Sequence, residues 1–416
     1  MPVFTSIFLA ALGLSLLSKF WLARRHLQHV AHHRDKVPPS FASRIALEAH
    51  RHAADYTTAK TRLSFIQNAQ EALVVLAFTL GGGLQYLANT SAGLSESPLL
   101  QGLILILSVI VISAVLEMPL NLYRTFGIEK RFGFNKMTPA MFIADVLKQS
   151  LLGLLFGAPM IAAVLWLMAE MGEYWWFYAW LAWMGFNLLV LSIYPTFIAP
   201  LFNKFSPLED AALKERINSL LKKCSFAAEG LYVMDGSKRS THGNAYFTGF
   251  GKNRRIVLFD TLIARLAPEE IEAVLAHELG HFKRRHILKR IIMLFALSLG
   301  FLYLLGVLMG APWFYQGLNV TTQSTGTAMV LFFLALPAFA FPFEPLFSLL
   351  SRKHEFEADE YAARQTDAAT LSNALIKLYR DNAATLTPDP LYSACYDSHP
   401  PALQRIEHLQ KIQLTP

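Results

Sequence analysis

Cysteine is almost absent from this sequence. Its 416 residues include two cysteines, Cys224 and Cys395, and these form no Cys-x-x-Cys pair. Such scarcity indicates a reducing compartment and excludes a zinc site built from thiolates. A metal site in this chain must therefore use histidine and carboxylate side chains.

Charged residues are also scarce in this sequence. Only 16% of the residues are charged and 54% are hydrophobic, whereas soluble domains contain about 25% charged residues. This deficit predicts a polytopic membrane protein. The net charge of +7 is typical of basic cytoplasmic loops and gives no reason to expect nucleic-acid binding. A basic cluster at 283–290 adjoins an apolar run, which favours a role in membrane topology or in contacting lipid headgroups.

Seven apolar runs are long enough to cross a bilayer as helices. The first has no basic region before it and no small-residue cleavage site before Arg24, so it is interpreted as a retained transmembrane helix and not as a signal peptide. Gly81, Gly82 and Gly83 in the second run predict either close helix packing or an irregular turn. The runs cover Val3–Leu22, 69–91, Leu99–Leu116, 150–168, 174–194, 287–310 and 327–350.

Lysine and arginine are distributed unevenly among the loops. The loops after runs 1, 3, 5 and 7 are rich in both, and those after runs 2, 4 and 6 have neither. The positive-inside rule then predicts a cytoplasmic C-terminus and an N-terminus on the other side. We expect five spans within residues 1–200, a cytoplasmic metalloprotease insert at 201–286, two spans at 287–350, and a C-terminal cytoplasmic part of the protease domain at 351–416.

The strongest chemical motif is His277-Glu278-Leu279-Gly280-His281. Pro268 is well placed to begin a helix that contains it. On a helix, residues four apart lie on one face with their Cβ atoms about 5–6 Å apart, so both histidines can reach one metal ion. Glu278 projects beside them as a general base for a water molecule. The alternative is an ordinary helix with two solvated histidines.

A catalytic zinc site commonly has three protein ligands, so one more is needed. Glu355, just after the seventh run, shares a helix face with Asp359, which is suited to hold the far ring nitrogen of a ligating histidine. Composition alone does not choose Glu355 over His354 or Glu357. A solvated charged helix is the alternative interpretation of this stretch.

With these motifs in view, the chain resembles the Ste24 family of integral-membrane zinc metalloproteases, the type 1 CAAX prenyl proteases. The resemblance implies an all-α polytopic fold, in which seven transmembrane helices form a barrel around a water-filled chamber. A small mixed α/β cytoplasmic insert would carry the site for one Zn²⁺ per chain. The resemblance covers nearly the full length and is carried by His277–His281, Ser351–Asp359, Gly236–Ser240 with Asn244–Phe247, Ser398–Pro401 with Arg405, Phe132–Lys136, and Tyr194–Pro195 with Pro200–Asn203.

Site residues follow from the resemblance position by position. Glu355 would be the third metal ligand and Asp359 its support, acting with the catalytic Glu278. His399 would lie near the metal and stabilise the oxyanion. From the residues alone, the His399-Pro400-Pro401 run could instead be a rigid loop.

The resemblance also implies substrate-binding residues. Asn244 and Tyr246 would lie in an edge strand that holds an extended peptide through main-chain hydrogen bonds, and Arg405 would lie near the metal beside the substrate. Asn244 could instead cap a turn.

The chain departs from the family pattern at two places. Family members often have a histidine where this chain has Tyr396, which puts the role of that histidine in doubt here, although a tyrosine can also donate a hydrogen bond. The insert between Asp260 and His277 is short, which is typical of a bacterial relative. We therefore expect a multi-pass protein of a bacterial inner membrane, or of the endoplasmic reticulum or nuclear membrane if the source is eukaryotic.

The predicted function is zinc-dependent hydrolysis of peptide bonds by a membrane-embedded endopeptidase. Its expected partners are membrane lipid and a peptide or protein substrate, prenylated or otherwise membrane-associated, with no nucleic acid, and the chain is expected to be a monomer. General quality control of membrane proteins is an alternative to CAAX processing. A transporter or receptor would need paired ionisable residues inside the spans, and the spans have almost none; a scaffold with an inactive metal site is the remaining alternative.

Overall fold

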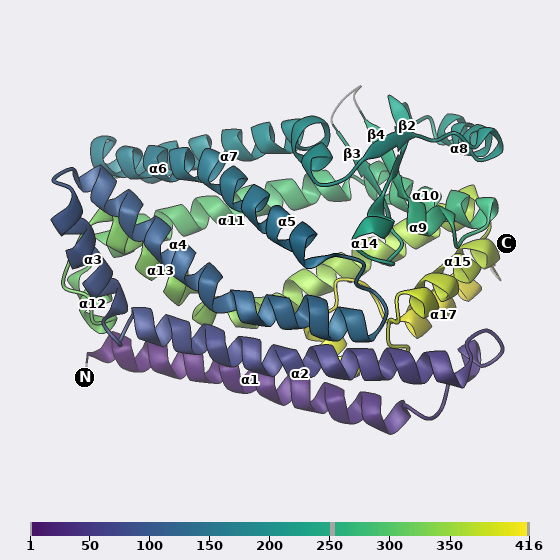
Figure 1. Cartoon of the computed structure of the whole chain (residues 1–416), viewed down its shortest axis with the longest axis horizontal. Coiled ribbons are helices and arrows are strands. Elements are labelled where there is room, and N and C mark those ends of the chain that lie inside the picture. The colour runs from purple at the N-terminus through teal and green to yellow at the C-terminus, as the bar shows by residue number, and fades with distance from the viewer. Residues whose placement is uncertain (1, 250–253, 414–416) are drawn as a thin grey trace.

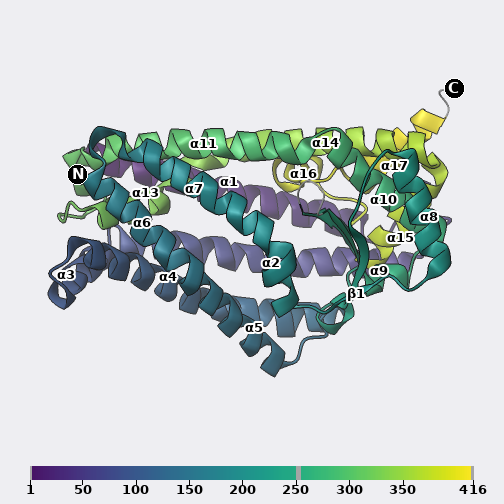
Figure 2. The same cartoon turned by 90° about the horizontal axis from the view of Figure 1, so that it is seen from above.

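The chain forms an elongated bundle of helices with a mixed α/β region at one end, in a computed structural model that describes residues 2–249 and 254–413 (Figure 1). The long helices run along the longest axis, and the sheet lies with α8 and α10 at the end opposite to α3 (Figures 1 and 2). Helix α1, Val3–His33, begins at one end of this axis, and α17, Ala402–Gln413, lies at the other.

Six helices in the described part of the chain are long and apolar enough to cross a membrane, and a bent helix pair brings the number to seven. The predicted runs are thus confirmed, but the helices extend well beyond them into polar sequence. The sixth unbroken span reaches from Thr325 to Gln365, so α13 and α14 carry the chain from the bilayer into the α/β region. The spans are Val3–His33, Pro98–Glu129, Pro139–Glu170, Gly172–Leu201, His286–Met309 and Thr325–Gln365.

The bent pair explains the triple glycine of the second run. Helix α2, Leu47–Phe78, meets α3, Gly83–Leu94, at an angle of 53°. Gly82 lies between them with φ of 76°, a left-handed conformation that glycine adopts without a steric penalty. Of the two predicted roles, the irregular turn is the one that the structure shows.

The α/β region is built on a four-stranded sheet of order β1-β2-β4-β3. Strand β4 pairs in parallel with β2 and antiparallel with β3, which makes β3 an edge strand. Strand β3 contains Tyr246 and is the expected edge strand, whereas β1 has only three residues and is not predicted from the sequence. The strands are β1 Phe205–Pro207, β2 Gly230–Met234, β3 Ala245–Thr248 and β4 Arg255–Phe259.

Helices pack on this sheet and bury one continuous core. Leu258 of β4 is fully buried together with Leu275 and Leu279, which lie on the helix that contains the two histidines of the motif. That helix, α10, begins at Pro268 as predicted, and the Glu270 side chain accepts a hydrogen bond from the Ala267 N–H at 2.8 Å.

The helices of this region are α8 Ala211–Lys223, α9 Asp260–Ile263, α10 Pro268–Lys283, α14 Glu344–Gln365, α15 Ala368–Asp381, α16 Pro390–Tyr396 and α17. The membrane part adds α4 Pro98–Leu122, α5 Pro139–Leu152, α6 Ala158–Glu170, α7 Trp175–Ile193, α11 His286–Met309, α12 Pro312–Gly317 and α13 Thr325–Ala340.

Three of the stretches that carry the family resemblance meet where the spans join the α/β region. Asn135 forms an isolated bridge with Ser240. The Arg239 guanidinium donates two hydrogen bonds to Asp145 of α5, at 2.9 and 3.0 Å, and a third to Asn203 at 3.0 Å. These contacts fix the sheet against the ends of the membrane helices.

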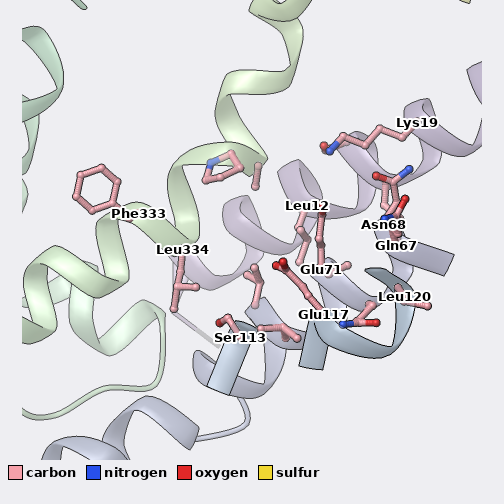
Figure 3. A pocket seen from close by; sticks show the side chains of 18 of the residues that line it. Leu12, Lys19, Gln67, Asn68, Glu71, Ser113, Glu117, Leu120, Phe333 and Leu334 are labelled. Carbon is pink, nitrogen blue, oxygen red and sulfur yellow. The ribbon is translucent and has the colours of Figure 1, made fainter. Parts of the chain in front are cut away.

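Two neighbouring cavities lie between the spans. The first, of about 370 Å³, is reached by Lys19 of α1, Glu71 of α2 and Glu117 of α4 (Figure 3). The second, of about 1180 Å³, lies toward the sheet and shares Glu117 and Asn121 with the first. The spans carry few ionisable residues, as expected, and Lys19 and Glu71, which lie inside the first two predicted runs, line the first cavity.

Candidate metal centre

Two helices bring three candidate metal ligands together. His277 and His281 lie one turn apart on α10, with their Nε2 atoms 3.2 Å from each other. Glu355 of α14 faces both, its Oε2 atom 3.5 Å from His277 Nε2 and its Oε1 atom 3.3 Å from His281 Nε2. The potential ligand atoms of the three residues all lie within 4.8 Å of one another.

This arrangement fits a zinc ion. Glu355 Oε2 is buried and accepts no hydrogen bond within the described part of the chain, and a buried carboxylate oxygen without a partner costs free energy unless a cation satisfies it. Two imidazole nitrogens and a carboxylate are one of the ligand sets used by catalytic zinc. The residues present therefore fit a metal that the motif alone could only suggest.

The far side of His277 is held by a buried carboxylate. Asp359, which has no exposed surface, places Oδ1 2.8 Å from His277 Nδ1, so the hydrogen on Nδ1 leaves Nε2 free for the metal. Burial lowers the pKa of His277, but the neighbouring carboxylates of Asp359 and Glu355 outweigh it and raise this pKa to about 9. The support expected from Asp359 is thus present in the geometry.

Arg405 contacts two carboxylates of the candidate metal centre. Its guanidinium donates to both oxygens of Asp359, at 2.8 and 2.5 Å, and its Nη1 atom lies 3.5 Å from Glu355 Oε2. Only 5% of the residue is exposed. Arg405 is near the metal site as expected, but this burial favours a role in holding Asp359 over the predicted contact with substrate.

The second ring nitrogen of His281 also contacts another side chain, and the sequence alone did not predict this contact. Its Nδ1 atom lies 3.0 Å from Nδ1 of His286, whose Nε2 atom lies 2.9 Å from a carboxylate oxygen of Glu357. The ring of His354 stacks on His286 with centroids 4.0 Å apart. Glu357 and His354, the two alternatives to Glu355 as a ligand, therefore contact His286, which in turn contacts His281. The sequence feature that could have predicted this arrangement is a histidine five residues after the motif.

We expect His286→Phe to lower the affinity for zinc by about 10- to 100-fold, because phenylalanine fills the space but cannot orient the His281 ring. Competition with a fluorescent chelator measures this affinity. His354→Phe is the control, since His354 stacks on His286 without bonding to His281. Equal affinities for His286→Phe and wild type would show that the His281–His286 contact has no positioning role.

The helices α10 and α14 approach most closely at Gly280, within the motif itself. A Cβ atom at this position would lie 2.9 Å from the Ala358 Cα atom and 3.0 Å from its carbonyl oxygen. A side chain here would force apart the two helices that carry the three candidate ligands. The glycine of the motif is thus a packing requirement of the centre.

Gly280→Ala is expected to destabilise the fold by about 1–3 kcal/mol through overpacking and to weaken zinc binding at the same time. Thermal unfolding in detergent and the zinc content after dialysis measure the two effects. Gly300→Ala in α11 is the matched control, because a Cβ atom there has no described atom within 4 Å. If both variants bind zinc like wild type, the crossing at Gly280 does not set the ligand geometry.

Glu278 lies near enough to the three candidate ligands for their charges to affect its pKa. In the described part of the chain no residue forms a hydrogen bond with its carboxylate, and burial raises its pKa above the usual range, a shift that the charges of His277 and His281 oppose. A raised pKa suits a group that must both accept and release a proton near neutral pH.

His399 lies at the open side of the centre. Its Nε2 atom is 3.5 Å from Glu355 Oε1, and 64% of its side chain is exposed. Helix α16 precedes His399 in the chain. Arg352 of α14 donates to the carbonyl oxygens of Ser393 and Ala394 in this helix, at 2.7 and 3.0 Å. The ring of Tyr396 instead packs on Tyr392, with centroids 5.0 Å apart, and no hydrogen bond joins it to the candidate ligands among the described residues.

The edge strand β3 offers main-chain groups beside α10. Asn244 directly precedes this strand, and its carbonyl oxygen accepts from the Phe259 N–H at 3.0 Å. Bonded pairs alternate along antiparallel strands, so Tyr246 also points its main-chain groups toward β4, and Ala245 and Phe247 point theirs outward. The predicted edge strand is thus present, but its outward main-chain groups belong to Ala245 and Phe247, which the sequence did not single out.

Comparison with known proteins agrees with this geometry. Residues 26–204 match the family model for the CAAX prenyl protease N-terminal region with five membrane helices, and residues 207–413 match that for peptidase family M48. The chain is 35% identical to the CAAX prenyl protease 1 homologue of Arabidopsis thaliana over 384 residues, which cover 89% of each protein. It is 33% identical to the homologue of Homo sapiens, covering 99% of this chain and 97% of that one. The crystal structure of Ste24p from S. mikatae superposes with a TM-score of 0.90 at 31% identity, covering 98% of this chain and 100% of that one.

Proposed function

Since this chain belongs to peptidase family M48 and is a membrane zinc metalloprotease, we propose that His277, His281 and Glu355 hold its catalytic zinc ion. One observation carries the proposal, namely the buried, unsatisfied Glu355 carboxylate facing both imidazoles. When bound, zinc supplies Lewis acidity, which lowers the pKa of a water molecule and polarises a peptide carbonyl. Every other catalytic task falls to side chains of this chain.

Glu278 accepts the proton of the attacking water and delivers it to the nitrogen of the leaving amine. Asp359 keeps the hydrogen of His277 on Nδ1. The exposed imidazole of His399 donates to the oxyanion that develops on the scissile carbonyl. Together these groups supply a base, an acid and an oxyanion donor on one side of the candidate metal centre.

The substrate lies extended along β3. Outward main-chain groups of Ala245 and Phe247 supply the hydrogen bonds, and Asn244 and Tyr246 shape the strand that presents them. Main-chain recognition of this kind selects an extended backbone with little dependence on sequence. We therefore propose a peptidase whose selectivity comes from access to the site.

Access is through the space between the spans. We propose that the seven spans form a barrel around a water-filled chamber and that the α/β insert carries the metal centre at one end of it. The two neighbouring cavities and the charged side chains of Lys19, Glu71 and Glu117 in their linings support this proposal, since these side chains need water inside a bilayer. The domain division at residues 200, 286 and 350 belongs to the same proposal.

The proposed substrates are prenylated or otherwise membrane-associated peptides and proteins. The relatives are named CAAX prenyl protease 1 homologues, and a site that opens between membrane helices suits a lipid-anchored chain. Broad quality control of membrane proteins is the second candidate. Proteins that accumulate when the enzyme is inactivated, identified by mass spectrometry, distinguish the two; unrelated multi-pass proteins among them would favour quality control. We propose that the monomer is the working unit.

We further propose a multi-pass topology with the C-terminus in the cytoplasm, in a bacterial inner membrane or, for a eukaryotic source, in the endoplasmic reticulum or nuclear membrane. Alternation of basic and uncharged loops supports this orientation. The beginning of α1 and the C-terminal helices lie at opposite ends of the long axis, as an odd number of spans requires (Figures 1 and 2). A reporter fused after α17 that is active only outside the cytoplasm should stay silent; activity there would reverse the orientation.

Metal analysis of the purified chain, with peptide cleavage measured on the same sample, tests the proposed centre. We expect one zinc ion per chain in wild type, and Glu355→Ala should lose most of its zinc and its cleavage because one of three ligands is gone. Glu357→Ala is the control on the same helix, and it should keep part of both. Full zinc occupancy in Glu355→Ala would rule out Glu355 as the third ligand.

A further inference from the structure

A pocket of about 520 Å³ lies where α10 ends and α11 begins, away from the metal centre. We call it the interface pocket. Phe247 and Thr248 at the end of β3 and Phe282 at the end of α10 contribute to its rim. The lining also contains three cations and four aliphatic side chains: Arg254, Lys283 and Arg285, and Leu191, Ile287, Leu288 and Ile291.

The aliphatic wall faces away from the protein. Leu191 is 41% exposed, Ile287 is 48% exposed and Leu288 is 49% exposed, and all three belong to candidate membrane spans. Apolar side chains with this exposure are stable where hydrocarbon covers them. One wall of the interface pocket is therefore continuous with the surface that acyl chains contact.

The cations of the pocket lack acidic partners. The Arg254 guanidinium lies over the rings of Phe282 and Phe226, 4.3 and 5.2 Å from their centroids, and Lys283 donates to a main-chain carbonyl. In the described part of the chain no carboxylate pairs with either residue or with Arg285, and none lines the pocket. Neighbouring Arg284, by contrast, lies 3.9 Å from Glu360. Three unpaired positive charges beside an apolar wall are complementary to an anion that carries hydrocarbon.

We propose that the interface pocket binds one anionic phospholipid. Its phosphate lies among Arg254, Lys283 and Arg285, and its acyl chains follow Leu191, Ile287 and Leu288 into the bilayer. Lys283 ends the helix that carries the metal-binding motif, and the substrate strand β3 ends at the rim, so a bound lipid packs against both. The proposed catalytic side chains do not line this pocket, and the site uses Lys283 and Arg285 of the basic cluster at 283–290, which have no role in the proposed hydrolysis.

Native mass spectrometry of the full chain in detergent tests the proposal, with phosphatidylglycerol and phosphatidylcholine of identical acyl chains as probes. We expect one retained phosphatidylglycerol per chain and no comparable retention of phosphatidylcholine. Each lysine or arginine near an anionic lipid surface contributes about fivefold in affinity. The double variant Lys283→Gln with Arg285→Gln should therefore bind phosphatidylglycerol about 30-fold more weakly.

Two control variants distinguish the loss of the pocket cations from a general loss of positive charge and from misfolding. Lys289→Gln removes an equally exposed cation one turn along α11 that does not line the pocket, and it should bind like wild type. Lys283→Arg with Arg285→Lys keeps both charges and should retain most of the affinity. The proposal fails if phosphatidylcholine binds equally well, if Lys289→Gln loses as much as the double variant, or if glycerol 3-phosphate competes as strongly as the lipid, since a free phosphate would then be the ligand.

Discussion

Glu278→Gln is expected to slow peptide hydrolysis by about 100- to 10,000-fold, the range that a positioned general acid–base contributes. Glutamine has the same size and also hydrogen-bonds to water, but it cannot take the proton of the attacking water or deliver it to the leaving amine. The zinc ligands are untouched, so the zinc content should equal that of wild type. Initial rates on a fluorogenic peptide, normalised to bound zinc, measure the effect.

Glu272→Gln provides the matched control for this experiment. It makes the same change on the same helix, but the Glu272 carboxylate pairs with Arg216 at 2.7 Å, away from the metal centre. We expect it to cleave at the wild-type rate. A Glu278→Gln enzyme that keeps its zinc and cleaves within tenfold of wild type would refute the assignment of Glu278 as the base.

Arg405→Gln is expected to destabilise the folded protein by about 3–5 kcal/mol, the usual cost of removing one partner of a buried ion pair. The reason is that Asp359 has no exposed surface and loses two charge-assisted hydrogen bonds with the guanidinium. Its negative charge is then compensated only by the imidazole of His277. The free energy of unfolding in mixed detergent micelles, measured with added zinc, reports this loss.

A second arginine–carboxylate pair supplies the comparison. Arg364 donates to Glu360 at 2.6 Å, but 64% of the arginine side chain and 35% of the glutamate side chain are exposed. Exposed pairs contribute about 0–1 kcal/mol, so Arg364→Gln should be nearly neutral. Arg405→Lys should recover only part of the loss, because an ammonium cannot engage both carboxylate oxygens as the planar guanidinium does. Equal destabilisation by Arg405→Gln and Arg364→Gln would contradict the importance of burial.

Some features of the fold were predictable because they depend on local sequence. Apolar runs locate the spans, and Pro268 with its apolar periodicity locates α10. The bend between α2 and α3 was only one of two options for Gly81–Gly83, because whether a neighbouring helix approaches these glycines is a tertiary property. Strand β1 is stabilised by pairing with β2, and three residues of local sequence carry too little signal to show it.

Some features of the candidate metal centre are likewise predictable from local sequence, and others depend on tertiary contacts. The spacing of His277 and His281 places both on one helix face whatever surrounds them. The choice of Glu355 over His354 and Glu357 depends on how α14 is rotated against α10, which the close contact at Gly280 determines. The burial of Arg405 under Asp359 depends on where α17 packs. Each of these is decided by contacts between segments far apart in sequence, which helix periodicity does not encode.

The ligands of the centre are also made at different times. During synthesis, His277 and His281 leave the ribosome before α11 and α13, and Glu355 and Asp359 follow only after these two spans. A nascent chain thus exposes the two histidines without their third ligand and without Arg405, which comes later still. Insertion of the last two spans brings α14 against α10, and only then is the set of ligands complete. The proposed set of ligands can therefore be complete only after the last two spans have been synthesised.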